Sequence, residues 1–182
     1  MEQQALRDLF EERARSVTAV VQGRPDLAGA LAYAVELTRE QGGGEIAAPG
    51  LEEAWASQLE SLCAEAGIRL LREGLRDQGQ GFHTGLCLAQ WGIADTGTLV
   101  IDSTSEELRL ATMLCEVQVA ILPAAGIRPD LAALAPELEE FMSRSPHYLA
   151  FISGPSRTAD IELSLTVGAH GPGQVHVIIL EQ

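Results

Sequence analysis

Over residues 2–21, apolar residues recur at intervals of three and four, the spacing that places them along one face of a helix. Pro25 and Asp26 open a second predicted helix over 26–40, and Gly67 ends a third over 50–66. Two further helices are predicted, one beginning at Ser105 and one spanning 130–143. The stretch TADIELSLTV, 158–167, is interpreted as a helical turn or a helix.

Short apolar runs between these helices predict strands, which lie at 45–48, 68–71, 98–102, 116–122, 148–153 and 175–180. Residues 74–85 are predicted to form an exposed loop, and 86–97 to be helical and then a turn. Strands that alternate with helices indicate an open, largely parallel sheet covered on both faces. We expect an N-terminal helical segment over 1–40 and one α/β domain over 41–182.

The composition supports a folded protein outside the membrane. Hydrophobic residues make up 46% of the 182 residues, which is too many for a disordered chain. No apolar run approaches the roughly 20 residues that span a bilayer. The charged N-terminal stretch MEQQALRDLFEERARS lacks the apolar core of a secretion signal, so we expect a cytoplasmic protein.

The charge of the chain restricts its partners and its chemistry. The net charge is −14, and all 12 basic residues are arginines. A field of this sign repels phosphate backbones, so nucleic acid is not expected as a partner. Because the chain has no lysine, it cannot form a Schiff base or a phosphate-binding loop that needs one. An anionic ligand would have to be bound by arginine, backbone N–H groups, hydroxyls or histidine.

Cysteine and histidine spacing predicts neither a metal site nor a cofactor. Cys63, Cys87 and Cys115 are far apart in the sequence and are expected to be buried free thiols. A cluster held only by cysteine needs four of them. The four histidines show no spacing typical of metal ligands.

The stretch ISGPSRTADIE, 152–162, follows a predicted strand, where ligands bind in open α/β sheets. Gly154 permits a sharp turn, Pro155 stiffens it, and Ser156 and Thr158 would lie at the start of a helix that favours an anion. Arg157 is the only basic residue after position 144 and can bind a carboxylate or phosphate with two parallel bonds. The alternative is structural: Ser156 or Thr158 caps the helix, and Arg157 pairs with Asp160 or Glu162.

Two other polar groups are candidates for the same site. His170 lies between glycines in GAHGPG, 168–173, where it would be available for acid–base chemistry or would simply support the loop. Thr96 and Thr98 flank Gly97 just before a predicted strand, as parts of a site or of a polar turn.

Three pieces of this sequence, GIADTGTLVID (92–102), ISGPSRTADIE (152–162) and GAHGPGQVHVIIL (168–180), resemble the LUD domain, and more narrowly the lactate-utilisation protein C (YkgG-like) family. The residues that match its motifs are Thr96, Gly97, Thr98, Gly154, Pro155, Ser156, Arg157, Thr158, Asp160, Glu162, His170, Gly171 and Pro172.

The resemblance implies a three-layer α/β/α fold similar to ribose-5-phosphate isomerase, glucosamine-6-phosphate deaminase and CoA-transferases. It also implies a component without a cluster of its own, which works with iron–sulfur partner proteins to oxidise L-lactate to pyruvate. The alternative is a small-molecule enzyme of that fold group. It would bind a phosphorylated or carboxylated ligand at residues 154–160 with Thr96, Gly97, Thr98 and Gly171, and use His170 or Glu162 as acid or base.

Three positions depart from the family pattern. Asp95 stands where relatives usually have Glu. Cys115 and Gln118 stand where relatives commonly have Pro and His, so a catalytic role for that histidine does not transfer to this chain.

Overall fold

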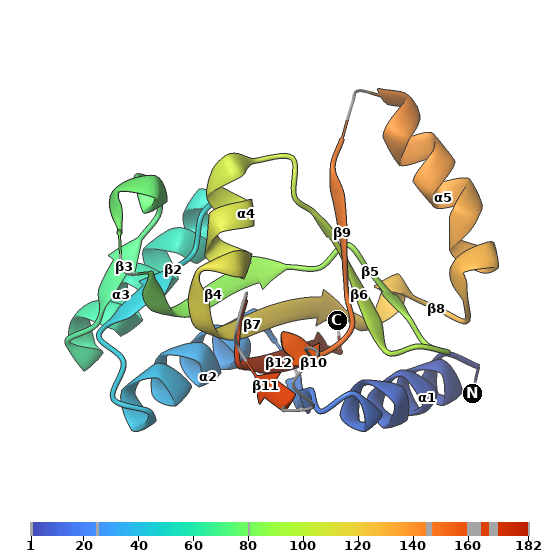
Figure 1. Ribbon diagram of the computed structural model, residues 1–182, viewed down its shortest axis with the longest axis horizontal. Coiled ribbons are helices and arrows are strands. Elements are labelled where there is room, and N and C mark those ends of the chain that lie inside the picture. The colour runs from blue at the N-terminus through green and yellow to red at the C-terminus, as the bar shows by residue number, and fades with distance from the viewer. Residues whose placement is uncertain are drawn as a thin grey trace.

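The computed structural model describes residues 2–24, 26–79, 81–144, 147–159, 165–167 and 171–181 (Figure 1). At its centre is a six-stranded sheet in which all neighbouring strands are parallel. In order across the sheet, the strands are β1 (Val20–Arg24), β12 (Gln174–Leu180), β7 (Cys115–Pro123), β4 (Phe82–Leu88), β2 (Glu45–Ala47) and β3 (Arg69–Leu71). The central strands β12, β7 and β4 are almost entirely buried, because helices or a second sheet cover both of their faces.

Two helices, α2 (Leu27–Glu40) and α3 (Glu53–Ala66), cover one face of this sheet. Their apolar sides form one cluster with β7 and β12, in which Leu31, Leu59 and Ile121 have no exposed surface. The opposite face is covered by α1 (Glu2–Ser16), by α4 (Glu106–Met113) and by a second, smaller sheet. Short 3-10 turns at Leu75–Asp77 and Ala124–Gly126 join these elements.

The second sheet has the strand order β8 (Ile127–Arg128), β5 (Trp91–Ile93), β6 (Thr98–Asp102) and β9 (Leu149–Ile152). Here β6 runs antiparallel to both of its neighbours, and β9 forms an edge of the sheet. The helix α5 (Leu131–Arg144) packs on this sheet through Leu134, which is fully buried against Ile93 and Val100. The predicted α/β/α layering around a mostly parallel sheet is therefore confirmed.

Local signals predicted several boundaries correctly. The side chain of Asp26 caps α2 by accepting a hydrogen bond from the Gly29 amide at 2.8 Å. Gly67 ends α3 in the left-handed conformation, with φ of 68°. Both signals depend only on residues close in sequence, which is why the sequence reveals them.

Three stretches of the chain were predicted wrongly. The first helix ends at Ser16, and the chain turns at Thr18 (φ 66°) into strand β1, so the helical periodicity of 2–21 extended too far. The predicted loop and helix over 74–97 contain the central strand β4 and strand β5. A strand that is buried on both faces has no alternation of apolar and polar residues, so its apolar run resembles a helix. The third error, at 158–167, concerns the candidate site and is described with it.

Among the described residues, none of the helices has the length and hydrophobicity that crossing a bilayer requires.

Candidate functional site

Two of the predicted motifs meet at one end of the second sheet. Strand β6 begins at Thr98 and pairs with the end of β9, so the 95–98 turn lies beside the turn that starts at Ser153. The Thr98 hydroxyl is 2.7 Å from the hydroxyl of Thr96 and 2.7 Å from that of Ser153. A chain of hydroxyls therefore links the two motifs, although 55 residues separate them in sequence.

Both turns also pack against the C-terminal end of α1. A Cβ atom at Gly97 would lie 2.6 Å from the Cα of Ala14, and one at Gly154 would lie 3.2 Å from the carbonyl carbon of Val17. Arg157 Nη2 donates to the Val17 carbonyl oxygen at 3.0 Å and also to the hydroxyl of Thr18. These contacts give Arg157 and the two glycines a structural role, whatever else they do.

The helix predicted at 158–167 is wrong for the described part of this segment. Strand β10 (Arg157–Ala159) pairs antiparallel with β11 (Leu165–Val167), with Thr158 opposite Thr166. The expected anion site at a helix N-terminus therefore loses its basis. Asp160, Glu162 and His170 lie outside the described residues, so their roles stay predictions.

The rule that ligands bind beyond the carboxyl ends of strands does not account for where these motifs lie. It applies to parallel sheets, whereas the strands that precede the two motifs belong to the second sheet, in which β6 is antiparallel to β9. What brings the motifs together is the antiparallel pairing, which places the start of one strand beside the end of the next.

The turn at residues 171–173 lies against the 154–157 turn. The Ser156 amide donates to the Pro172 carbonyl at 2.9 Å, and the Gly173 amide donates to the carbonyl of Glu116 at 2.9 Å. A side chain at Gly171 would come within 3.3 Å of the Ser156 Cβ. These contacts attach both motifs to the start of β7, and Pro155 is buried.

These turns form one side of a cavity of about 370 Å³, which we call the Gln118 pocket. Its other walls are α4, the edge strand β9 and the middle of β7. The residues that line it are Ser103, Arg109, Thr112, Met113, Gln118, Ala150, Phe151, Ile152, Ser153, Gly154, Ser156, Gly171 and Pro172. Of the predicted site residues, Gly154, Ser156 and Gly171 line this pocket, whereas Thr96, Gly97, Thr98, Pro155 and Arg157 do not. Its volume is within the range typical of small-molecule sites.

Gln118 is the most unusual wall residue. It has no exposed surface, and its Nε2 donates to Cys87 Sγ at 3.6 Å. Its Oε1 is the one buried side-chain oxygen or nitrogen of the described residues that has no hydrogen-bond partner. A buried acceptor without a partner costs free energy unless something donates to it. The residue was noted in the sequence only as a departure from the family, yet a glutamine within the apolar run EVQVAIL was the available signal.

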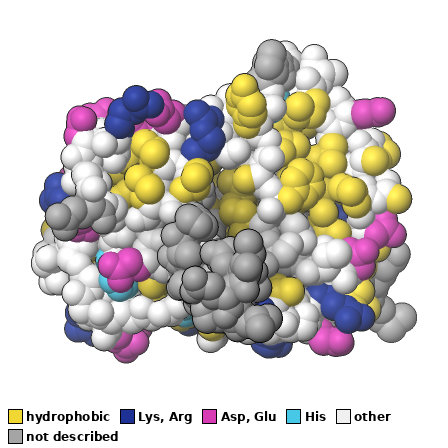
Figure 2. Space-filling model, in the orientation of Figure 1, with side chains coloured by type: hydrophobic (Ala, Val, Ile, Leu, Met, Phe, Trp, Pro, Cys, Tyr) yellow, Lys and Arg dark blue, Asp and Glu magenta, His cyan; other side chains and the backbone are white. Residues whose placement is uncertain are grey.

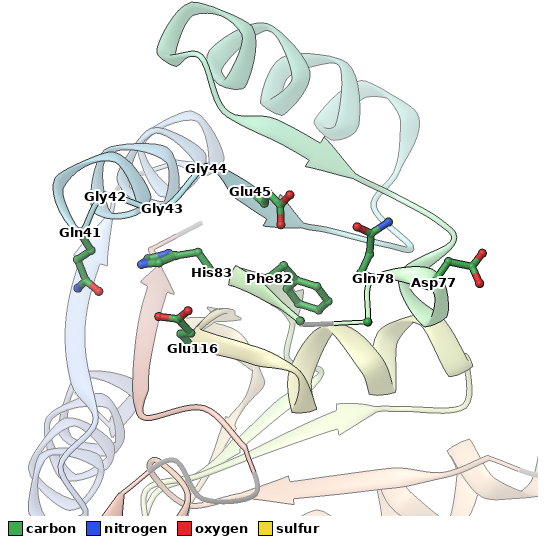
Figure 3. A pocket seen from close by; sticks show the side chains of 12 residues that line it. Gln41, Gly42, Gly43, Gly44, Glu45, Asp77, Gln78, Phe82, His83 and Glu116 are labelled. Atoms are coloured by element: carbon green, nitrogen blue, oxygen red, sulfur yellow. The ribbon is translucent and has the colours of Figure 1, made fainter.

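A larger, open cavity of about 760 Å³ lies at the amino ends of β2, β4 and β7, and Figure 3 shows its walls. We call it the glycine-run pocket, since Gly42, Gly43 and Gly44 form one side of it. His83 and Glu116 lie together near this run, with Gln78 and Asp77 on the other side (Figure 3). A Cβ at Gly43 would overlap the His83 ring, so the absence of a side chain there makes room for the imidazole. The charged residues that line it are acidic, which disfavours an anionic ligand.

The cysteines and one histidine are held in neutral forms. Burial raises the pKa of Cys63 and of Cys87 to about 11 and that of Cys115 to about 12. The predicted buried, free thiols are confirmed. Burial lowers the pKa of His176, whose Nδ1 lies 2.8 Å from the Tyr33 hydroxyl. Among the described residues, no group of three or more His, Cys, Asp or Glu side chains could hold a metal ion.

The fold is that of an α/β protein, and a cavity of about 370 Å³ lies between its two sheets. The family model for the LUD domain matches residues 4–180, and the chain belongs to this family. The resemblance predicted from the three motifs is therefore confirmed.

Several curated proteins are similar to part of the chain. The uncharacterized protein YkgG of Escherichia coli (strain K12) is 36% identical over 107 residues, which are 57% of this chain and 46% of that protein. Lactate utilization protein C of Halalkalibacterium halodurans is 33% identical over 112 residues, 60% of this chain and 49% of that protein. The protein of the same name from Geobacillus thermodenitrificans is 31% identical over 107 residues, covering 57% and 45%. The matched stretch thus spans less than half the length of each relative.

A solved structure confirms the fold over the whole chain. The crystal structure of a DUF162 family protein from Deinococcus radiodurans superposes with a TM-score of 0.65, covering 100% of this chain and 99% of that one. The sequence identity is 17%, so this similarity bears on the fold alone.

Proposed function

We propose that the protein is a lactate-utilisation protein C-like component of a cytoplasmic system that oxidises L-lactate to pyruvate. It works with iron–sulfur partner proteins and carries no cluster itself. The observation that carries this proposal is the membership of the LUD domain family, together with relatives that are named lactate utilization protein C. Three widely separated, buried cysteines are consistent with a component that holds no cluster.

Growth on L-lactate tests the proposal. Deleting the gene in the source organism should abolish growth on L-lactate as the only carbon source and leave growth on pyruvate unchanged. An intact copy should restore growth. A tagged copy purified anaerobically at low salt should retain iron–sulfur proteins, visible by their absorbance near 420 nm. Normal growth of the deletion strain on L-lactate would refute the proposed role.

A second candidate function is binding or conversion of a small carboxylated or phosphorylated molecule. The Gln118 pocket favours it, because three predicted site residues, Gly154, Ser156 and Gly171, line a cavity of metabolite size. Arg157 was predicted to bind the anion, but among the described residues its guanidinium bonds to the end of α1. Of the described residues that line the pocket, Arg109 is the charged one, and it takes the place of Arg157 as the candidate.

Thermal-shift measurements with sugar phosphates, CoA esters and 2-hydroxy acids test this second function. A bound ligand should raise the melting temperature by mass action. The pocket assignment predicts that Phe151→Glu, which puts a negative charge into the wall, removes the shift, and that Arg157→Ala keeps most of it. Loss of the shift in Arg157→Ala but not in Phe151→Glu would instead indicate that the ligand binds at the 154–160 turn.

A further inference from the structure

Strand β9 is an open edge of the second sheet. Four strands end the two larger sheets, namely β1, β3, β8 and β9. Three of them contain an arginine, at Arg24, Arg69 or Arg128, and charged side chains on an edge strand discourage pairing with another chain. By contrast, β9 has the sequence LAFI, with neither a charge nor a proline. An apolar edge of this kind is a template for a further strand.

The outer side of β9 carries unpaired backbone groups. The Ser103 amide donates to the Tyr148 carbonyl at 2.7 Å, so the backbone of Tyr148 is directed at β6. In an antiparallel pair this direction alternates, so the N–H and C=O groups of Leu149 and Phe151 point away from β6. Among the described residues, none forms a hydrogen bond with these outward groups. In Figure 1, β9 lies in front of β5 and β6, and no described strand pairs with its outer side.

The surface around this edge is apolar. Phe151 and Met113 both line the Gln118 pocket, so the end of α4 lies beside β9. The ring centres of Phe141 and His147 are 4.3 Å apart, which brings the end of α5 to the start of β9. Figure 2 shows hydrophobic side chains gathered over this part of the molecule, around β9 and α5. The exposed large hydrophobic residues at the ends of α4 and α5 and along β9, which we call the β9 face, are Met113, Leu114, Met142, Tyr148 and Phe151.

The β9 face is large enough for a stable interface between proteins. Its side chains are each between 43% and 68% exposed. A large side chain has roughly 200 Å² of surface, so together they expose about 500 Å² of apolar area. A standard interface buries about 800 Å² on each partner, of which a little over half is apolar. Two copies that meet through this face therefore bury the apolar area that a stable dimer needs.

Charge favours a second copy over a partner of another kind. At a net charge of −14, two copies repel each other wherever acidic residues face acidic residues. Neither β9 nor the β9 face contains an acidic residue, so two copies can meet there without opposing carboxylates. The same residues offer no charge by which a different partner could be selected, and specificity between proteins depends largely on such charges. Two antiparallel strands related by a two-fold axis present the same groups to each other, as a closed dimer requires.

We propose that two copies of this chain form a dimer in which their β9 strands pair antiparallel. Within the bounds of β9, one register pairs both outward residues: Leu149 lies opposite the partner's Phe151, and Phe151 lies opposite the partner's Leu149. Each of these pairs exchanges its N–H and C=O groups, which joins the two four-stranded sheets into one continuous sheet. Ala150 then lies opposite the partner's Ala150 at the two-fold axis. The dimer is independent of both proposed functions, since neither needs a second copy.

Sedimentation velocity measures the association of the full chain. Between about 1 and 100 µM, the fraction of dimer should rise with concentration, as a dissociation constant in the micromolar range requires. Because the copies repel each other through their net charge, the dimer should strengthen between about 50 and 500 mM NaCl. Weakening over this range would indicate an interface held by opposite charges and would overturn the proposal. A chain that stays monomeric at about 100 µM in the higher salt would overturn it as well.

A positive charge on the edge should break the dimer. Phe151→Lys places an ammonium group on β9 beside the axis and should weaken the dimer by about tenfold or more. The substitution lowers the net negative charge, so general repulsion cannot explain such a loss.

The matched control is Val20→Lys, at a residue that is 40% exposed on the edge strand β1. It makes the same change in net charge and should leave the dimer unchanged. Both positions are about half exposed, so both variants should keep the circular dichroism spectrum of the wild-type protein. No effect of Phe151→Lys, or an equal effect of the two substitutions, would remove the assignment to β9.

A disulfide tests the register and leaves the apolar face intact. In the proposed pairing the two Ala150 Cα atoms are about 4.5 Å apart, within the range that a disulfide bridges. Ala150→Cys should therefore give a covalent dimer on mild oxidation, whereas Ser153→Cys, about 20 Å from its counterpart, should not. The native cysteines are buried and should not compete. No covalent dimer of Ala150→Cys, or equal yields from the two variants, would contradict the pairing.

A different partner on the same face gives a distinct result. The wild-type chain would then stay monomeric alone but retain an iron–sulfur protein on purification, and Phe151→Lys would release that protein. This outcome would assign the β9 face to another protein and overturn the dimer.

Discussion

The contact between the 95–98 turn and helix α1 can be tested by adding a single methyl group at Gly97. Gly97 has φ of 63°, and a Cβ there would lie 2.5 Å from the carbonyl carbon of Arg13, 2.6 Å from the Cα of Ala14 and against the Ala14 amide nitrogen. These are backbone atoms, so no side-chain rotation can relieve the overlap. Either the turn or the end of α1 must move in Gly97→Ala.

The expected cost has two parts. A residue with a Cβ in the left-handed region costs about 1–2 kcal/mol relative to glycine. Overpacking a tight contact adds about 1–3 kcal/mol. Moving α1 would also disturb Phe10 and Ala14, both of which are fully buried. We therefore expect Gly97→Ala to lower the free energy of unfolding by about 2–5 kcal/mol.

Gly74→Ala is the matched control. Gly74 has φ of 71°, nearly the same conformation, but no heavy atom lies within 4 Å of its Cβ position. It should lose only the conformational part, about 1–2 kcal/mol. The difference between the variants isolates the contact with α1, since the effect of alanine on the unfolded chain is the same in both.

Urea unfolding followed by circular dichroism measures both variants. The midpoint should fall further in Gly97→Ala, with the slope unchanged if only stability has altered. For a chain of this length, each kcal/mol corresponds to a fall of about 2–4 °C in the melting temperature. Equal losses in the two variants would show that the turn does not rest on the α1 backbone, and the position of the hydroxyl chain through Thr98 would then need another explanation.

Three further predictions follow from burial and hydrogen bonding. Burial raises the pKa of all three thiols, so in the native protein at pH 7.5 they should react slowly with a disulfide reagent. In guanidinium chloride all three should react completely. Fast labelling of the native protein at Cys63, Cys87 or Cys115 would contradict this prediction. Burial lowers the pKa of His176, so the unfolded chain takes up its proton first, and stability should be lost as the pH falls below the ordinary value of about 6.5. Urea unfolding should therefore show that the free energy of unfolding falls more between pH 7.5 and pH 5.5 in the wild-type protein than in His176→Gln. Equal falls in the two proteins would contradict a role for His176. Arg157→Ala should lower the free energy of unfolding by about 1 kcal/mol, because it removes the hydrogen bond to the Val17 carbonyl. The surface control Arg39→Ala should change the free energy of unfolding by less than about 0.5 kcal/mol. Equal effects of the two substitutions would mean that the hydrogen bond to Val17 adds nothing to stability.

Helix α2 and strand β4 show why some elements could be predicted and others could not. The start of α2 depends on Asp26 and an amide three residues away, so the sequence contains the whole signal. The residues Leu86 to Leu88 of β4 form an apolar run whose neighbours, β7 and β2, lie far away in sequence. Their environment on both faces decides that they form a strand, and no local pattern records it.

The candidate site was predicted only in part, for a related reason. Gly154, Ser156 and Gly171 were recognised because they belong to compact motifs, and they do line one pocket. The sequence did not reveal that Gln118 and Arg109 line the same pocket, since each stands alone in its own element. What makes Gln118 unusual is a missing hydrogen bond, which becomes visible only when every neighbour has a position.

The sequence by itself determined the α/β class, the family, the buried free thiols and the exclusion of lysine chemistry, because these follow from composition, local capping and contiguous motifs. Only the tertiary structure decided that the 95–98 and 153–157 turns share a hydroxyl chain and rest on α1. It also decided that Arg109, Gln118 and the glycine turns surround one cavity. Those facts depend on the antiparallel pairing of β6 with β9 and on the packing of the second sheet over β7. Contacts between residues that are distant in sequence arise from the burial of whole faces, and no stretch of the chain encodes them alone.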